Sequence, residues 1–279
     1  MKYNKTIQIC IFDENPNGMM MAELSNWNGR VYKISRNEIR EFGERKDSEY
    51  TGLYFLFGKN DDEENFVYVG EAEHLYTRIK QHYKDKLYWN ECVILMSKEN
   101  GLNKAHVKFL ENKFYTLAIN AKRAKVINST IPTCSSISEF DEFMLQEFIE
   151  NACLMINTLG NKTFEKFAAD GVEKRITFQI VAARGANAKA NPVSEGFLVL
   201  AGSEIATDVT KSISKSLKNL REKLISKGII KNNMFVSDYV FTSPSLAAAI
   251  VMGRNANGRT EWKEISSGKT LKDIEEKNG

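Results

Sequence analysis

Two short β-type runs in this chain each carry a tyrosine hydroxyl beside a glycine, and four polar groups of other kinds follow them. The runs are Gly52-Leu53-Tyr54 and Tyr68-Val69-Gly70, and the later groups are Arg78, His82, Glu111 and Asn128. Hydrolysis of a phosphodiester needs a water made nucleophilic, a cation on the non-bridging oxygens and stabilisation of charge at the leaving oxygen. Hydroxyl, imidazole, guanidinium and carboxylate groups together can supply these needs.

Glu111 is the candidate metal ligand, because Mg²⁺ prefers oxygen ligands and keeps several waters. It falls in an expected helix, with Lys104 and Lys108 seven and three residues before it on the same face. The simpler interpretation is a pair between Glu111 and Lys108 on a solvated helix face, which is the usual state of a single glutamate in a helix. Only the presence of the other candidate residues favours Glu111 as a metal ligand.

Tyr54 and Tyr68 are expected on neighbouring strands of one small sheet. A tyrosine hydroxyl titrates near ~10, so it needs a cation or an adjacent base to act as a base at neutral pH. Two aromatic residues in a strand core are the ordinary alternative. Gly52 and Gly70 at the strand ends favour function, since glycine there indicates close approach of a ligand or a bulge that aims the tyrosines.

Arg78 and His82 lie four residues apart, which places them one above the other on a helix face. An arginine can hold a phosphate through two hydrogen bonds, and a histidine can pass a proton to or from a neighbouring hydroxyl. Without the other residues, an exposed arginine and a partly buried histidine would be the plainer interpretation. We assign His74 and His106 to structure, because His74 precedes the helix and His106 lies off the Lys104–Glu111 face.

The elements that must hold these groups follow from periodicity. Apolar patterns predict strands at 52–58, 66–70 and 91–96, and helical spacing predicts helices at 73–83 and 104–118. Before them, three strand-like segments with the hairpin signal Asn28-Gly29 predict a small antiparallel β unit. After them, Ser138 and Asp141 open an acidic helix that ends near Gly160.

The expected fold class is α+β in four parts. They are an N-terminal antiparallel β unit at 1–45, a core with the candidate site at 46–130, a linker and acidic helix at 131–163, and a separate small α+β domain at 164–279. In the last part we expect strands at 175–183, 196–202 and 260–263, a helix at 208–227, and a helix that Ser243 caps and Gly253 closes.

Composition predicts a soluble globular protein. Apolar residues make up 42% and charged residues 27% of the chain, and the longest apolar runs are far too short to span a bilayer, so no membrane association is expected. No signal-peptide pattern opens the chain. Four scattered cysteines are expected as buried free thiols in a reducing cytoplasm, at Cys10, Cys92, Cys134 and Cys153.

Charge is unevenly distributed along the chain. The net charge is +3, with −5 over residues 131–170 and +6 over residues 171–279. The basic C-terminal third fits a module that contacts DNA, and it fits a solvated basic face equally well.

The two tripeptides and the order of the residues after them resemble the GIY-YIG nuclease family. Leu53 and Val69 replace the family's isoleucines, Arg78 follows Gly70 by eight residues, and a histidine four further on matches His82. The resemblance spans residues 50–130. It implies a three-stranded antiparallel sheet flanked by helices, and hydrolysis of DNA with one divalent metal, Mg²⁺ or Mn²⁺.

The resemblance also implies a role for each residue. These are metal binding by Glu111, deprotonation or orientation of the attacking water by Tyr54 alone or through His82, charge stabilisation by Arg78, and shaping of the site by Tyr68 and Asn128. Many family members carry lysine directly after the second tripeptide, where this chain has Glu71. That change removes an electrostatic helper or adds a second carboxylate near the metal.

Two functions therefore stay open. The expected one is a metal-dependent DNA endonuclease, in restriction or phage defence, in repair, or in the processing of mobile elements. The alternative is a nucleic-acid-binding accessory protein with an inactive nuclease fold, for which Glu71 is the best support. One site cuts one strand, so a double-strand break would need a homodimer or two successive nicks.

The C-terminal part carries a second resemblance. Its motifs are the run Gly196 to Ser203, the run Phe241 to Ala249, Asn257-Gly258 and Trp262. They are similar to a domain of unknown function that trails GIY-YIG nucleases and resembles modules attached to restriction-associated adenine methyltransferases. The resemblance implies DNA binding through basic residues, sensitive to modification of the DNA. Packing of a small core is the plainer alternative, and for Trp262 it is the one we expect.

Overall fold

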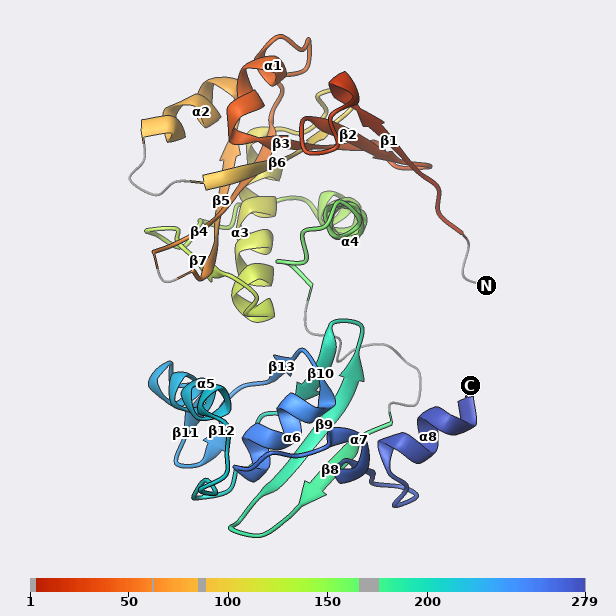
Figure 1. Ribbon diagram of the computed structural model, residues 1–279. Helices are drawn as coiled ribbons and strands as arrows, with labels where there is room; N and C mark the ends of the chain where they lie inside the picture. Colours follow the sequence, from red (N-terminus) through yellow and green to blue (C-terminus); the bar gives the residue numbers. More distant parts are fainter. Residues whose placement is uncertain (1–3, 62, 85–88, 166–175, 279) are drawn as a thin grey trace. The chain divides into compact units, whose positions relative to one another are not determined.

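The computed structural model describes residues 4–61, 63–84, 89–165 and 176–278, and it divides the chain into two compact units (Figure 1). The units are Met1–Lys166 and Phe167–Gly279. The class is α+β, as predicted, with a large sheet in the first unit and a separate sheet with its own helices in the second. The parts of the predicted domains at 1–3, 166–175 and 279 lie outside the described residues.

The first unit is built on a seven-stranded sheet with the order β1-β2-β3-β6-β4-β5-β7. The strands are β1 (Ile7–Ile11), β2 (Met20–Leu24), β3 (Gly29–Ser35), β4 (Gly52–Lys59), β5 (Asn65–Ala72), β6 (Trp89–Ser97) and β7 (Lys125–Val126). All neighbours are antiparallel except β5 and β7. The expected three-stranded antiparallel core is β6-β4-β5, and the whole length of β3 pairs with the segment Glu91 to Ser97 of β6. The strands predicted as a separate N-terminal unit thus continue the sheet of the core.

Helices cover both faces of this sheet (Figure 1). One face carries α1 (Ile39–Gly43) and α2 (Leu75–Gln81), and the other carries α3 (Lys104–Ala121) and α4 (Glu139–Thr158). Short 3₁₀ turns lie at η1 (Phe12–Glu14), η2 (Arg36–Glu38) and η3 (His82–Lys84). The predicted start of the acidic helix is confirmed, because the Ser138 hydroxyl accepts a hydrogen bond from the Asp141 backbone.

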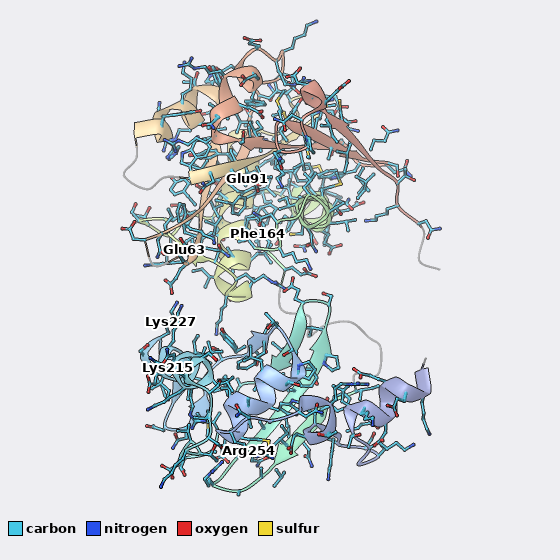
Figure 2. The ribbon with its side chains drawn as sticks, viewed as in Figure 1. Glu63, Glu91, Phe164, Lys215, Lys227 and Arg254 are labelled. Atoms are coloured by element: carbon cyan, nitrogen blue, oxygen red, sulfur yellow. The ribbon has the colours of Figure 1, made fainter. Side chains whose placement is uncertain are left out.

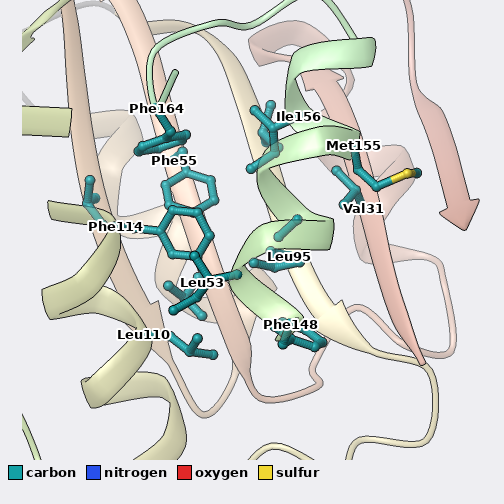
Figure 3. Packing of buried hydrophobic residues seen from close by; sticks show 14 of the residues in the cluster. Val31, Leu53, Phe55, Leu95, Leu110, Phe114, Phe148, Met155, Ile156 and Phe164 are labelled. Carbon is teal, nitrogen blue, oxygen red and sulfur yellow. The ribbon is translucent and has the colours of Figure 1, made fainter. Parts of the chain in front are cut away.

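Strand alternation divides the first unit into two apolar clusters, one on each face of the sheet. On the α3 face, the rings of Phe55, Phe114 and Phe164 meet at centroid distances of 4.8 to 5.1 Å (Figure 3). Phe164 follows α4 and was expected to open the C-terminal domain. It instead completes the core of the first unit, because three aromatic rings bury together more favourably than an exposed ring.

The second unit holds a five-stranded sheet with the order β13-β10-β9-β8-β14. Its elements are β8 (Phe178–Val181), β9 (Asn187–Val193), β10 (Gly196–Val199), α5 (Lys215–Ser226), β11 (Ile230–Lys231), β12 (Met234–Phe235), β13 (Tyr239–Phe241), α6 (Pro244–Met252), α7 (Gly258–Glu261), β14 (Lys263–Glu264) and α8 (Leu271–Asn278). The caps predicted for α6 are confirmed, with the Ser243 side chain at its start and Gly253 at a φ of 63° after its end. Trp262 is fully buried, as expected, and its indole N–H donates to the Pro244 carbonyl at 3.0 Å.

Three predictions for the second unit are wrong. The helix predicted at 208–227 begins only at Lys215, where the Ser214 side chain caps it. In the segment 260–263, Thr260 and Glu261 end α7 and only Lys263 is in a strand, because the Asn257 side chain accepts from the Arg259 backbone and starts a helical turn. Strand β9 was not predicted, since Asn187–Val193 has neither a clear apolar alternation nor a proline-free run.

The structure bears on two of the predictions made from composition. None of the helices in the described parts of the chain has the length and apolar character that a bilayer crossing requires. All four cysteines are free thiols, but only Cys92 is buried, whereas Cys10 and Cys134 are exposed. Cys10 lies on the outer strand of the sheet and Cys134 lies in the loop before α4, so neither position can bury a side chain.

Candidate active site

The register between β4 and β5 places the two tyrosines on one face of the sheet. Tyr54 pairs with Gly70, and Tyr68 lies two residues before Gly70 on β5. The tyrosine rings stack with centroids 6.1 Å apart. A Cβ at position 70 would stand 2.3 Å from Tyr54 Cζ and 2.4 Å from its hydroxyl oxygen, so the glycine of the second tripeptide makes room for the tyrosine of the first.

His82 lies behind Tyr54 at the end of α2. Its Nε2 is 2.9 Å from the Tyr54 hydroxyl, and both side chains are buried. The Trp89 indole N–H donates to the His82 carbonyl at 3.3 Å, which anchors the turn that holds the imidazole. In the tautomer whose Nε2 carries no hydrogen, the phenol donates to the ring.

Arg78 stands one helical turn before His82 and is exposed. Its Nη1 donates to Gln81 Oε1 at 2.6 Å, which leaves the rest of the guanidinium to face the tyrosines. The neighbouring Tyr54 raises the pKa of Arg78, so the charged form is favoured. Burial raises the pKa of Tyr54 and the neighbouring Tyr68 adds to the rise, whereas Arg78 opposes it. Tyr54 therefore stays a neutral phenol at neutral pH.

The outward backbone groups of β5 are hydrogen-bonded first by β7 and then by a side chain. β7 pairs with the first part of β5, where the Ile127 N–H donates to the Val67 carbonyl at 3.0 Å. The Asn128 amide then takes the place of a further strand residue, because its Oδ1 accepts from the Val69 N–H at 3.0 Å and its Nδ2 donates to the Val69 carbonyl at 2.7 Å. Asn128 therefore holds the strand segment that carries Tyr68 and Gly70.

Glu111, on α3, lies beside the outer edge of β5 at Glu71. It is half-buried, and it forms no ion pair within the described parts of the chain, so the alternative of a pair with Lys108 is not what the structure shows. Burial raises the pKa of Glu111 to about 7, and the nearby Glu71 carboxylate adds to the rise. A hydrogen bond from the Glu71 backbone and the charges of Lys104 and Lys108 act in the opposite direction.

Glu71 is a member of the site that residue types alone did not assign. Both of its carboxylate oxygens lie 3.0 Å from Lys104 Nζ, and Glu73 approaches the same ammonium at 3.3 Å. The Glu71 side chain is 15% exposed. Its position directly after the second tripeptide was the only signal in the sequence, and its partner Lys104 comes from a distant helix.

One pocket of about 390 Å³ collects most of these groups. Its lining includes Tyr54, Tyr68, Glu71, Arg78, Lys104 and Glu111, together with His74, which we had assigned to structure. A second pocket of about 230 Å³ shares Tyr68 and Glu111 with the first and adds Lys108 and Asn128. Five of the six predicted residues line one or both of these pockets. His82 lines neither, and it reaches the first pocket only through its hydrogen bond to Tyr54. His106 is structural as expected, since it completes the cap of α3 with Asn103.

The pocket meets the donor requirements of a hard divalent cation. Two carboxylates, from Glu71 and Glu111, line it, and the Glu71 charge raises the pKa of Glu111. No three His, Cys, Asp or Glu side chains gather in the described residues in a way that could hold a metal. An ion here would therefore have few protein ligands and keep several waters, which suits Mg²⁺ or Mn²⁺ and not zinc.

Comparison with known proteins adds one finding. Residues 178–275 match a domain of unknown function, DUF4357, and this match lies within the second unit. The prediction that the C-terminal part is a domain of unknown function is confirmed. No significant similarity to this chain was found among curated proteins or among solved structures.

Proposed function

We propose that the first unit is a GIY-YIG-type endonuclease that hydrolyses phosphodiester bonds of DNA with the help of a divalent metal. The observation that supports this proposal best is the single pocket lined by Tyr54, Tyr68, Arg78 and Glu111, with His82 hydrogen-bonded behind Tyr54. The two tripeptides, Arg78, His82 and Glu111 come from β4, β5, α2, η3 and α3, and Asn128 follows β7, so their arrangement depends on the fold and not on the sequence spacing alone.

The pair Tyr54 and His82 provides a path for a proton. A water that approaches the phosphorus can give its proton to the Tyr54 oxygen while the phenol passes its own proton to His82 Nε2. This relay avoids a free phenolate, which the buried setting of Tyr54 disfavours by raising its pKa. The P–O bond to the leaving oxygen then breaks, and that oxygen takes up a proton from solvent.

The charged groups at the pocket suit the phosphate on one side and a metal ion on the other. Arg78, whose charged form is favoured, is positioned to hold non-bridging oxygens of the phosphate. Glu111, with Glu71 beside it, would hold the metal, which when bound supplies positive charge to the phosphate and lowers the pKa of a water. A bound cation would also relieve the repulsion between the two carboxylates.

The direct test is nicking of supercoiled plasmid by the full chain with Mg²⁺, with Mn²⁺ and with EDTA. We expect metal-dependent nicking that Glu111→Gln reduces by at least ~100-fold. Glu147→Gln is the matched control, because Glu147 is an exposed glutamate on α4. Equal cleavage by wild type and Glu111→Gln would refute the assignment of Glu111.

The alternative is a DNA-binding protein without cleavage, and the Glu71–Lys104 pair supports it. Lys104 is engaged by Glu71 and Glu73, so this cation is directed away from an incoming phosphate. DNA binding that weakens with salt, with no cleavage under any metal, would favour this alternative. Restored cleavage in Glu71→Lys, the residue of many family members, would then identify Glu71 as the cause.

For the second unit we propose contact with the DNA backbone. Exposed lysines surround α5, and within the described residues five of them form no ion pair, namely Lys211, Lys215, Lys218, Lys223 and Lys231. Lys215 and Lys227 mark the two ends of this helix in Figure 2. Exposed cations without an ion-pair partner, three of them on α5 and two in the segments beside it, suit a polyanion.

This second proposal is tested by binding and not by cleavage. The double substitution Lys215→Glu and Lys218→Glu should weaken DNA binding by the full chain about 10-fold or more, and lower the dependence of affinity on salt. Lys272→Glu on α8 is the control, because Lys272 already pairs with Glu276. Adenine-methylated and unmethylated DNA should be compared, since a difference would support a role in restriction or defence. Unchanged affinity in the double variant would refute the proposal.

A further inference from the structure

A half-buried ammonium beside the candidate site has no anionic partner. Lys108 lies on α3 one helical turn before Glu111, and its side chain forms no ion pair and no hydrogen bond within the described parts of the chain. A charge that is partly removed from water loses hydration, and an opposite charge is needed to offset that loss. Lys108 is therefore suited to an anion that arrives with a ligand.

Lys108 lines the smaller of the two pockets, which has a volume of about 230 Å³. This pocket shares Tyr68 and Glu111 with the pocket that Arg78 lines, and the loop at 129–133 supplies most of its remaining lining. Three residues of the loop carry hydroxyl groups, namely Ser129, Thr130 and Thr133. Within the described residues these hydroxyls form no hydrogen bond, so each can bond to a ligand.

The loop is anchored at both of its ends. Asn128, directly before it, bonds to the Val69 backbone of β5 at 3.0 and 2.7 Å. Near its other end, the Asn112 side chain on α3 donates to the Pro132 carbonyl at 2.8 Å, and Pro132 itself is buried. The pocket wall is thus preformed, which lowers the cost of ordering it when a ligand binds.

The charges of this pocket suit a phosphate. Lys108 and Glu111 are the charged side chains among its lining residues, and Glu111 is the proposed metal ligand. With Glu111 neutralised by a metal ion, the pocket offers one ammonium and several hydroxyls. Lysine binds phosphate as a point charge, and serine and threonine hydroxyls are frequent donors to phosphate oxygens of a nucleic acid.

We propose that this pocket binds the backbone phosphate next to the one that is cleaved, with Lys108 as its cation. The inference rests on the proposed function, because that function places the cleaved phosphate between Arg78 and Glu111. Since the two pockets share Tyr68 and Glu111, a strand that leaves the first enters the second directly. Phosphates recur along a strand at a fixed spacing, so neighbouring pockets take neighbouring phosphates.

This contact gives Lys108 a role in binding and not in bond breaking. A phosphate held beside the reacting one carries no sequence information, but it fixes the position of the strand. The cleaved phosphate is then held in register with the Tyr54 hydroxyl and Glu111, which lie in the adjoining pocket. Loss of Lys108 should therefore weaken the complex with DNA at every sequence alike.

The salt dependence of DNA binding by the full chain gives the first test. With Ca²⁺ present and a fluorescein-labelled duplex as the probe, Lys108→Met should weaken binding ~10-fold. The slope of log Kd against log salt concentration should fall by about 0.9, the value of one phosphate contact. Lys113→Met is the matched control, because Lys113 is a half-buried lysine of α3 that lines neither pocket. An unchanged slope in Lys108→Met overturns the proposal.

Two further variants separate the charge from the hydroxyls. Lys108→Arg keeps the cation and should keep the salt slope of the wild type. Thr130→Val with Thr133→Val keeps the shape of the loop but removes two donors, so affinity should fall ~3- to 10-fold while the salt slope stays the same. Unchanged affinity in the double variant would overturn the assignment of the hydroxyls, and a lost slope in Lys108→Arg would overturn that of the charge.

Thymidine 5′-monophosphate distinguishes a strand phosphate from a free nucleotide. It offers a single phosphate group, so it should bind at least ~100-fold more weakly than the duplex. Tight binding of the mononucleotide that Lys108→Met abolishes, together with an unchanged salt slope for DNA, would assign the pocket to a free nucleotide. That result would overturn the proposal.

Plasmid nicking separates a failure of this inference from a failure of the nuclease. Lys108→Met should raise the plasmid concentration for half-maximal rate ~10-fold and leave the saturating rate within ~3-fold of wild type, because the lost contact is made before and during the reaction alike. Absence of nicking by the wild type refutes the nuclease, whereas the salt slope still tests Lys108 without cleavage. A lower saturating rate with unchanged binding would overturn the binding role.

Discussion

The two edges of the large sheet differ in how their backbone groups are used. At the β5 edge, β7, the Asn128 side chain and the Glu111 carboxylate engage successive residues of the strand. At the β1 edge, none of the described residues engages the outward groups of Ile7, Ile9 and Ile11. Side chains that complete an edge locally fix a pocket, whereas an edge left bare is suited to another strand.

The comparison also explains why the candidate site lies at β5. Tyr68 projects to the face that α2 covers, and Glu71 lies on the face of α3, because successive residues of a strand alternate. Groups on opposite faces of an interior strand would be separated by the sheet. Among the described residues, strand β7 pairs only with Phe66 and Val67 of β5, and beyond them Glu111 of α3 and the tyrosines Tyr54 and Tyr68 line one pocket.

The largest expected effect follows from Gly70→Ala, which would break the packing at the β5 edge. The new methyl group would overlap the Tyr54 ring at 2.3 Å, so the ring or the strand must move. We expect a loss of about 1–3 kcal/mol in the free energy of unfolding, as for overpacked cores, with nicking activity reduced to background. Chemical denaturation and plasmid nicking measure the two effects.

Gly101→Ala is the control for this substitution. At position 101 a Cβ would meet only Ser97 Oγ at 3.6 Å, an ordinary contact. Stability and activity should both stay near those of the wild type. If Gly70→Ala behaved in the same way as Gly101→Ala, the close fit between the two tripeptides would not matter to the site.

Tyr54→Phe isolates the hydroxyl from the packing. The ring remains between Gly70 and Tyr68, but the hydrogen bond to His82 Nε2 is lost. We expect stability within about 1 kcal/mol of wild type and a fall in the rate of DNA cleavage of ~10²- to 10⁴-fold, the usual range for removal of an acid–base group. Single-turnover cleavage with Mg²⁺ would reveal it. An unimpaired Tyr54→Phe would exclude the proton path through His82.

Asn128→Ala removes the side chain that seals β5 next to the pocket. Two hydrogen bonds to the Val69 backbone would be lost, at 3.0 and 2.7 Å in the structure. Loss of about 1–2 kcal/mol in unfolding free energy is expected, since water can replace part of the bonding. Asn120→Ala, at an exposed position of α3, should be close to neutral. Equal stability of the two variants would mean that the β5 edge does not depend on Asn128.

The signals from which the sequence predicts the candidate site are local. Each tripeptide carries its own strand, Arg78 and His82 share one helix and its following turn, and Ser138 caps α4 through a residue three positions away. Four of the six residues predicted from these motifs line one pocket, namely Tyr54, Tyr68, Arg78 and Glu111, whereas His82 lies behind Tyr54 and Asn128 lines a second pocket.

What sequence reasoning missed depends on pairing between distant segments. β3 pairs with β6 although more than fifty residues separate them in the sequence, and neither strand has a local pattern that identifies its partner. The role of Asn128 requires the register of β5, and the Glu71–Lys104 pair requires the position of α3 over that strand. Local residue patterns carry no information about such contacts until the sheet has been assembled.

Glu111→Gln should make stability less dependent on pH. Burial raises the pKa of Glu111 to about 7, so the folded protein binds a proton that the unfolded chain releases near pH ~4.3. Stability from this group is therefore complete below pH ~4.3 and is lost as the pH rises through 7. With EDTA present, Glu111→Gln should be more stable than wild type by about 1–2 kcal/mol at pH 8, after allowance for solvent screening. No gain relative to Glu147→Gln would contradict the buried setting of Glu111.

The smallest effect is expected from Ile9→Lys on the outer strand of the sheet. Ile9 is 46% exposed and its backbone already bonds to no described group on the outer side, so a lysine there disturbs little. The change in unfolding free energy should stay within ~0.5 kcal/mol, as for ordinary surface substitutions. A loss above 1 kcal/mol would show that the β1 edge contributes to the folded monomer as the β5 edge does. The β1 and β5 edges would then differ in their residues and not in whether they stabilise the folded chain.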